Sequence, residues 1–191
     1  MKGAAKMENN NRATSRIVIP CRFAYLNCWR PVAQYNGRQK YTVAAVIDKK
    51  DKDTISQIED AIEYVKNQSV QLWGGRIPMN LKLPLHDGDE EKPDNAAFRN
   101  CYFINAKSKD APQIVDCDVK PITDQTEVYS GCYGKISITF YSYNFGGAKG
   151  IAAWLGNILK LRDGEPFTGK IGAQDEFQVE ERRCLNASCH A

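Results

Sequence analysis

The chain has 191 residues, 42% of them hydrophobic and 26% charged, with a formal net charge of +3. This length and composition predict one globular domain with its own core, and the mildly basic charge permits a nucleic-acid partner without requiring one. No segment approaches the roughly 18 apolar residues of a membrane helix, and the N-terminus lacks the apolar stretch of a signal peptide. We therefore expect a cytoplasmic protein without membrane contact, in which the seven cysteines are free thiols.

The first 50 residues predict a disordered segment followed by two strands. Residues 1–14 are polar, basic and rich in Asn, without hydrophobic periodicity, which predicts disorder. Apolar residues alternate over 15–26, as in a strand, and Pro20 indicates that this strand lies at an edge or carries a bulge. A second strand is expected over 40–49, because it follows the turn-prone stretch YNGRQ.

The clearest helix is expected over residues 51–68. Thr54 can cap its start, with Gln57 three residues later as in a capping box. The apolar side chains share one stripe, which predicts the face that packs on the core. The stripe consists of Ile55, Ile58, Ala61, Ile62 and Val65.

The second half of the chain predicts an insertion, three strands and a late helix. Residues 74–97 have no regular pattern and include the acidic stretch HDGDEEKPDN, which indicates an exposed insertion. Strands are expected over 98–108, 112–117 and 128–145, the last of them bent at its glycines. A helix is expected over 150–164.

The late helix would turn Ile151, Trp154 and Leu155 toward the core. The expected fold is therefore mainly β, with five strands in a small bent barrel, one inserted helix and one late helix. A β-sandwich is the competing fold, and it would need more strands. We expect the folded domain to cover 15–172 and a mildly acidic tail to cover 173–191, where four acids oppose two arginines.

The sequence holds no complete enzyme motif. The stretch GEPFTGK (164–170) has the spacing of a phosphate-binding loop, but Ile171 replaces the Ser or Thr that binds magnesium. His86 lies beside consecutive acids that lack the spacing of a calcium loop. Three further candidate ligands lack a fourth for zinc: Cys184, Cys189 and His190. We expect no enzyme, no metal and no cofactor.

The strand over 135–145 separates an apolar face from a face of rings and cations. By alternation, the apolar face holds Ile136, Ile138 and Phe140. The opposite face holds Lys135, Ser137, Thr139, Tyr141, Tyr143 and Phe145. Such a face suits single-stranded nucleic acid, because unpaired bases stack on rings at about 1–3 kcal/mol each while Lys and Arg neutralise phosphates.

Residues 130–170 resemble the C-terminal signature of a family of phage single-stranded-DNA-binding proteins. The resemblance rests on YGKISITFYSYN, GGAKGIA and LGNILKLRDGEP, and upstream on RIVIPCRFAYLNCWRP and FRNCYFINAKSKDAPQIVD in the same order. It implies an OB-fold barrel that coats single-stranded DNA during phage replication and recombination. The implied partners are DNA and a phage or host polymerase, helicase or recombinase. The sequence does not fix the oligomeric state, and a homodimer stays open.

The resemblance also implies that the DNA follows a basic, aromatic groove of the barrel. Nine positions are carried over to that groove, and alternation along the strands selects most of them as well. They are Lys40, Tyr41, Arg99, Phe103, Lys107, Lys135, Tyr141, Tyr143 and Lys149. The chain departs from the resemblance at its tail, because many such proteins end in a strongly acidic segment that recruits other replication proteins.

Other functions stay open from the residues alone. An RNA-binding OB-fold protein would use the same surface, and the sequence does not show whether the bound strand contains ribose or deoxyribose. A metal-dependent nuclease would need converging acids, for which Asp116, Asp118 and Asp124 are the nearest candidates. A structural assembly protein would bind no DNA.

Overall fold

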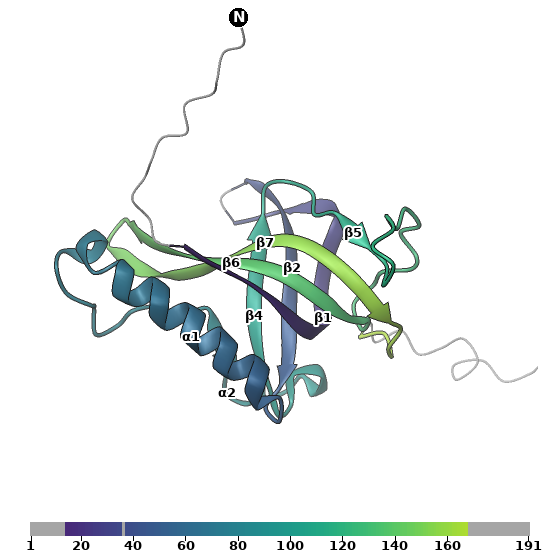
Figure 1. Ribbon diagram of the computed structural model, residues 1–191, viewed down its shortest axis with the longest axis horizontal. Helices are drawn as coiled ribbons and strands as arrows, with labels where there is room; N and C mark the ends of the chain where they lie inside the picture. The colour runs from purple at the N-terminus through teal and green to yellow at the C-terminus, as the bar shows by residue number, and fades with distance from the viewer. Residues whose placement is uncertain (1–13, 36, 168–191) are drawn as a thin grey trace, which may run out of the picture.

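The computed structural model describes residues 14–35 and 37–167. Strands dominate it, and two α-helices and two short 3₁₀ helices lie between them (Figure 1). The elements are β1 (Thr14–Ala33), β2 (Gln39–Asp48), α1 (Lys52–Gln68), η1 (Gln71–Trp73), β3 (Leu85–Asp87), α2 (Gly88–Glu91), η2 (Ala96–Phe98), β4 (Cys101–Ser108), β5 (Ile114–Val115), β6 (Tyr133–Phe145) and β7 (Ala148–Arg162).

Five strands close into a barrel. β1 lies between β2 and β6, β2 pairs with β4, and β6 pairs with β7, all antiparallel. A short parallel pairing of β4 with β7, at Ala106–Ala153 and Lys107–Trp154, closes the circle. The predicted mainly β, five-stranded barrel is confirmed, and the strand order is consistent with an OB-fold.

β1 is long enough to serve two neighbours in turn. Its first half pairs with β6 as far as Arg22, and its second half pairs with β2 from Arg22 onward. Pro20 therefore lies where β1 has β6 on one side and no β2 pairing on the other. This agrees with the edge position that proline indicated, because proline has no N–H to donate to a second neighbour.

α1 buries the predicted apolar stripe against the inner faces of β1 and β6. Its N-cap is Asp51 and not Thr54, because the Asp51 carboxylate accepts the backbone N–H of Thr54 at 3.1 Å. Thr54 lies one turn inside the helix and is itself buried. The helix thus covers the core on this side of the barrel, and Figure 1 shows it lying alongside the strands.

The predicted late helix is wrong, because residues 148–162 form the strand β7. Ile151, Ala153 and Leu155 point inward at the spacing of a strand, and Ile158 points inward three residues later. A register shift explains why the spacing of the inward residues changes from two to three, since Ile138 pairs with Leu155 whereas Ile136 pairs with Ile158. The extra residue gave the inward positions a spacing that resembles a helix.

The predicted insertion over 74–97 is structured, because it contains β3, α2 and the start of η2. β3 pairs with β4, and Phe98 at the end of η2 is buried. The segment therefore covers part of the outer face of the barrel. Within the described residues, no helix is both long and apolar enough to cross a membrane.

Candidate nucleic-acid interface

Three neighbouring strands of the barrel carry cations and no acid. β1 has three Lys or Arg residues, β6 has one and β7 has three, while none of the three strands contains Asp or Glu. The cations are Arg16, Arg22, Arg30, Lys135, Lys149, Lys160 and Arg162. These three strands thus form the part of the molecule that attracts a polyanion.

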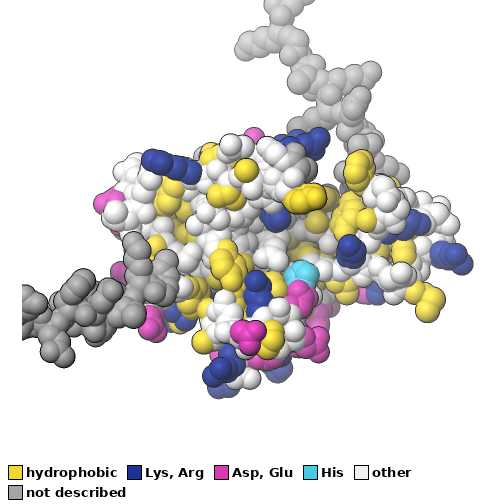
Figure 2. Space-filling model, turned by 180° about the vertical axis from the view of Figure 1, so that it is seen from behind, with side chains coloured by type: hydrophobic (Ala, Val, Ile, Leu, Met, Phe, Trp, Pro, Cys, Tyr) yellow, Lys and Arg dark blue, Asp and Glu magenta, His cyan; other side chains and the backbone are white. Residues whose placement is uncertain are grey.

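The acids gather on other elements. α1 holds four acids and two lysines, and the stretch from Asp87 to Asp94 holds five acids and one lysine. In Figure 2, magenta acidic side chains cluster beside the cyan histidine on the lower part of the molecule, apart from most of the dark blue cations. The fold therefore separates the two signs of charge, although the sequence mixes them.

Cross-strand neighbours place a ring between two cations on the outer face of the barrel. Arg16 pairs with Thr139, Thr139 with Trp154, and Trp154 with Lys107 across the closing seam. Paired residues point to the same side of a sheet, and Arg16 and Lys107 are exposed while Trp154 is 49% exposed. Arg16, Lys107 and Trp154 thus lie in one outward row.

Tyr141 completes this group, because its ring centroid lies 5.9 Å from that of Trp154, with a tilt of 60° between the rings. We call Arg16, Lys107, Tyr141 and Trp154 the ring-and-cation site. A hollow of about 250 Å³ lies beside Trp154, lined among others by Arg16 and Thr139, with Asp110 as the one acid at its border. The site offers stacking surfaces with positive charge on both sides.

Three of the nine predicted positions fall on this part of the surface. Lys107 and Tyr141 belong to the ring-and-cation site, and Lys135 is exposed on the same outward face of β6. The alternation predicted for β6 is present, because Ile136, Ile138 and Phe140 are fully buried.

Tyr143 and Lys149 anchor the β6–β7 hairpin to η1. The backbone carbonyl of Tyr143 accepts the indole N–H of buried Trp73 at 3.1 Å, and the Lys149 ammonium donates to the Trp73 carbonyl at 2.8 Å. The ring of Tyr143 lies directly over Gly150, where a Cβ atom would clash with it. These two side chains therefore have structural contacts in the hairpin.

The remaining four predicted positions are spread over the barrel. Tyr41 packs against the main core, and Lys40 beside it is partly buried. Arg99 is exposed at the end of η2, before β4 begins. Phe103 is only 1% exposed, so its ring is not presented at the surface.

Phe103 is buried because the segment before β4 folds over it. Phe98 packs edge-on against its ring with centroids 5.0 Å apart, and His86 stacks on it at 5.0 Å. Alternation placed Phe103 on the outer face of the barrel, which is correct, but the insertion turns this part of the outer face into a second, smaller core.

Sequence reasoning missed Arg16 and Trp154. Trp154 was assigned to the inner face of a helix, whereas alternation with Ile151, Ala153 and Leu155 would have placed it outward on a strand. Arg16 lies between Ser15 and the inward-facing Ile17, so the same rule applied to β1 would have found it.

The structure gives no support to the nuclease hypothesis. Within the described residues, no group of three His, Cys, Asp or Glu side chains could hold a metal ion. Asp116 instead accepts the backbone N–H groups of Asp118 and Lys120, and Asp124 binds Thr126, which lowers the pKa of Asp124. Most of the sequence GEPFTGK is described, but its last three residues and the C-terminal Cys184, Cys189 and His190 lie outside the described residues.

Comparisons with known proteins point to one family. The model of a family described as the ssDNA-binding protein of Enterobacter phage Enc34 matches residues 14–184. A relative described as putative protein p50, from Acyrthosiphon pisum secondary endosymbiont phage 1, is 30% identical over 166 residues, which are 80% of this chain and 87% of the relative.

Two solved structures show the same fold at low sequence identity. The single-stranded DNA-binding protein from bacteriophage Enc34, solved in complex with ssDNA, has a TM-score of 0.70 at 23% identity and covers 86% of this chain and 96% of its own. The single-stranded DNA-binding protein gp2.5 of bacteriophage T7 has a TM-score of 0.56 at 17% identity, covering 90% of this chain and 97% of its own.

Proposed function

The chain belongs to the family of phage single-stranded-DNA-binding proteins typified by that of Enterobacter phage Enc34, and on this premise we propose that it binds single-stranded DNA without sequence preference through the ring-and-cation site. The family is one of DNA-binding proteins and not of enzymes, in agreement with the lack of a complete enzyme motif in the sequence.

The observation that carries the proposal is an exposed tryptophan in an outward row, on three neighbouring strands without acids. Trp154 and Tyr141 offer faces on which unpaired bases stack, at about 1–3 kcal/mol per base. Lys107 lies on the strand next to Trp154, and Arg16 lies on the other side, two strands away across Thr139. In this proposal both side chains neutralise phosphates of the strand. Stacking accepts every base, so binding is independent of sequence.

Duplex DNA fits this site less well. Its bases are already stacked on one another, so Trp154 and Tyr141 gain nothing from them, and only the phosphate contacts remain. We therefore expect a clear preference for single strands.

The biological role that we propose is to coat and protect single-stranded DNA during phage DNA replication and recombination in the host cell. A phage or host polymerase, helicase or recombinase would then act on the coated strand. Family membership supports this role, and the three strands without acids, β1, β6 and β7, supply a surface along which a DNA strand can lie.

A titration with labelled oligomers tests the proposal. Full-length protein is added to an oligo-dT of about 16 nucleotides, the upper site size of one OB-fold, and separately to a duplex and an RNA of the same length. Tighter binding to the DNA single strand, weakened in Trp154→Ala, supports the proposal. Equal affinity for duplex and single strand would overturn it, and a clear preference for the RNA would assign the surface to RNA binding.

A further inference from the structure

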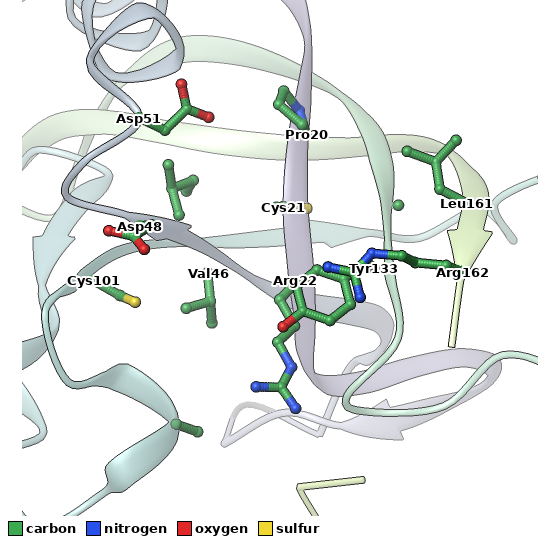
Figure 3. Close-up of a pocket in the computed structure, with 13 residues that line it drawn as sticks. Pro20, Cys21, Arg22, Val46, Asp48, Asp51, Cys101, Tyr133, Leu161 and Arg162 are labelled. Carbon is green, nitrogen blue, oxygen red and sulfur yellow. The ribbon is translucent and has the colours of Figure 1, made fainter. Parts of the chain in front are cut away.

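A second hollow opens on the outer face of the barrel at the point where β1 separates from β2 (Figure 3). Its volume of about 400 Å³ lies within the range of about 300–1,000 Å³ that is usual for small-molecule pockets. It lies beside Pro20 and Arg22 of β1, four to six residues beyond the ring-and-cation site at Arg16. Four to six residues of a strand span about 13–20 Å, so the two places are distinct.

One wall of this hollow is the ring of Tyr133 with the guanidinium groups of Arg22 and Arg162 beside it. The Arg162 guanidinium carbon lies 3.5 Å from the centroid of the Tyr133 ring, and that of Arg22 lies 5.2 Å from it. Arg22 is fixed, because it donates to the backbone carbonyls of Gly131 at 3.0 Å and Glu165 at 2.6 Å. Within the described part of the chain, Arg162 forms no ion pair with a carboxylate.

The opposite wall is acidic. Figure 3 shows Asp48 and Asp51 on one side of β1, and Tyr133, Leu161 and Arg162 on the other. The Asp51 carboxylate caps α1, whereas the Asp48 side chain is exposed and accepts the backbone N–H of Lys50 at 2.9 Å. Apolar side chains line the space between the walls, among them Val46, Ile47 and Leu161.

This combination selects its ligand. Two carboxylates repel a phosphate group, and an aliphatic side chain would leave both the acids and the arginine without a partner. A flat base with an amino group suits the stacking wall, the apolar space and the acidic wall together. It stacks on a ring or a guanidinium plane, and it donates its amino hydrogens to a carboxylate. Aspartate accepts the N4 amino group of cytosine in this way.

We propose that this hollow is a second DNA subsite, which takes one unpaired base bearing an exocyclic amino group, with Asp48 accepting from the amino group and Tyr133 and Arg162 forming the stacking wall. The inference rests on the proposed function, because the same single strand that lies on the ring-and-cation site would continue along β1 to reach it. It adds a modest base preference to a protein that otherwise binds every sequence: cytosine fits, whereas thymine, which has a carbonyl in place of the amino group, does not.

The test compares oligo-dC with oligo-dT of about 16 nucleotides on the full-length protein, and the measured quantity is the ratio of the two affinities. A ratio removes the general effect of charge, because loss of an acid strengthens the binding of both oligomers alike. We expect wild type to favour oligo-dC by about fivefold. Asp48→Asn, which keeps an acceptor for the Lys50 N–H, should bring the ratio close to one.

Asp60→Asn is the matched control, because it removes an exposed acid from α1 and lies outside the lining of the hollow. It should leave the ratio as in wild type, and thermal melting should show all three proteins folded. A wild-type ratio of one, or a ratio that Asp48→Asn leaves unchanged, would overturn the subsite while leaving the proposed function intact. If wild type binds no single-stranded DNA at all, both the subsite and the proposed function are overturned.

Discussion

Trp154→Ala is the change that most directly tests the interface. If one base stacks on the indole, its removal costs about 1–3 kcal/mol of binding free energy, which is about a 5- to 150-fold loss of affinity. The fold should tolerate the change, because the residue is 49% exposed and its ring contacts Tyr141 with centroids 5.9 Å apart. We expect a loss of about 1–2 kcal/mol in stability, compared with about 3–5 kcal/mol for a buried aromatic ring.

The assay is a fluorescence anisotropy titration with labelled oligo-dT, performed well below the melting temperature of each variant. Tyr64→Ala is the matched control, because it removes a ring of similar exposure, 53%, from the acidic helix α1. Trp154→Phe keeps a stacking face and should retain most of the affinity. If folded Trp154→Ala binds as wild type does, or if Tyr64→Ala weakens binding equally, the DNA does not lie on the ring-and-cation site.

Three further results are expected. The logarithm of the affinity should fall linearly with the logarithm of the salt concentration, and Arg16→Gln and Lys107→Gln should each reduce the slope by about 0.7 if each residue neutralises one phosphate; unchanged slopes would exclude these contacts. Hydrogen bonds from Lys49 hold the pKa values of Asp87 and Asp89 below the ordinary value of 3.8. The folded state therefore binds fewer protons than the unfolded state near that pH. The stability that these two aspartates add with Lys49 at neutral pH is lost as the pH falls below 3.8. Between neutral and acidic pH, the melting temperature of wild type should therefore fall further than that of Lys49→Met. Equal falls would show that the ion pairs of Lys49 add no stability. Phe103→Ala should cost about 3–5 kcal/mol of unfolding free energy in a denaturant titration, because the ring is buried; a loss of DNA affinity with unchanged stability would instead restore Phe103 to the interface.

Hydrophobic periodicity in the sequence correctly predicted the buried faces of α1 and β6. The stripe of α1 has a period close to 3.6 and is buried as expected, and the inward residues of β6 alternate without interruption. These elements have no bulge between their apolar positions, so periodicity and burial agree. The same reasoning predicted four of the five barrel strands. The expected strand over 112–117 forms only the two-residue β5, and β7, which was predicted as a helix, takes the fifth place in the barrel.

Phe103 shows where such reasoning stops. Its place on the outer face of β4 followed from alternation, but exposure depends on whether another segment covers that face. Here Phe98 and His86, which precede it in the chain, pack on its ring. A residue on an outer face can therefore belong to a core, and only the tertiary fold distinguishes the two.

The bulge in β7 explains both the misassigned helix and the missed tryptophan. The Ser137 hydroxyl accepts the backbone N–H of Asn157 at 2.7 Å, and a Cβ atom at position 156 would lie 2.2 Å from that hydroxyl oxygen, so Gly156 is the residue that fits there. The bulge lets Leu155 and Ile158 both point into the barrel although they are three positions apart, an odd spacing that regular alternation would send to opposite faces. Before the bulge the strand alternates without interruption, which leaves Trp154 outward beside Lys107 and Tyr141. One glycine and one serine hydroxyl thus keep β7 in register with the core while its tryptophan lies on the surface where a base can stack.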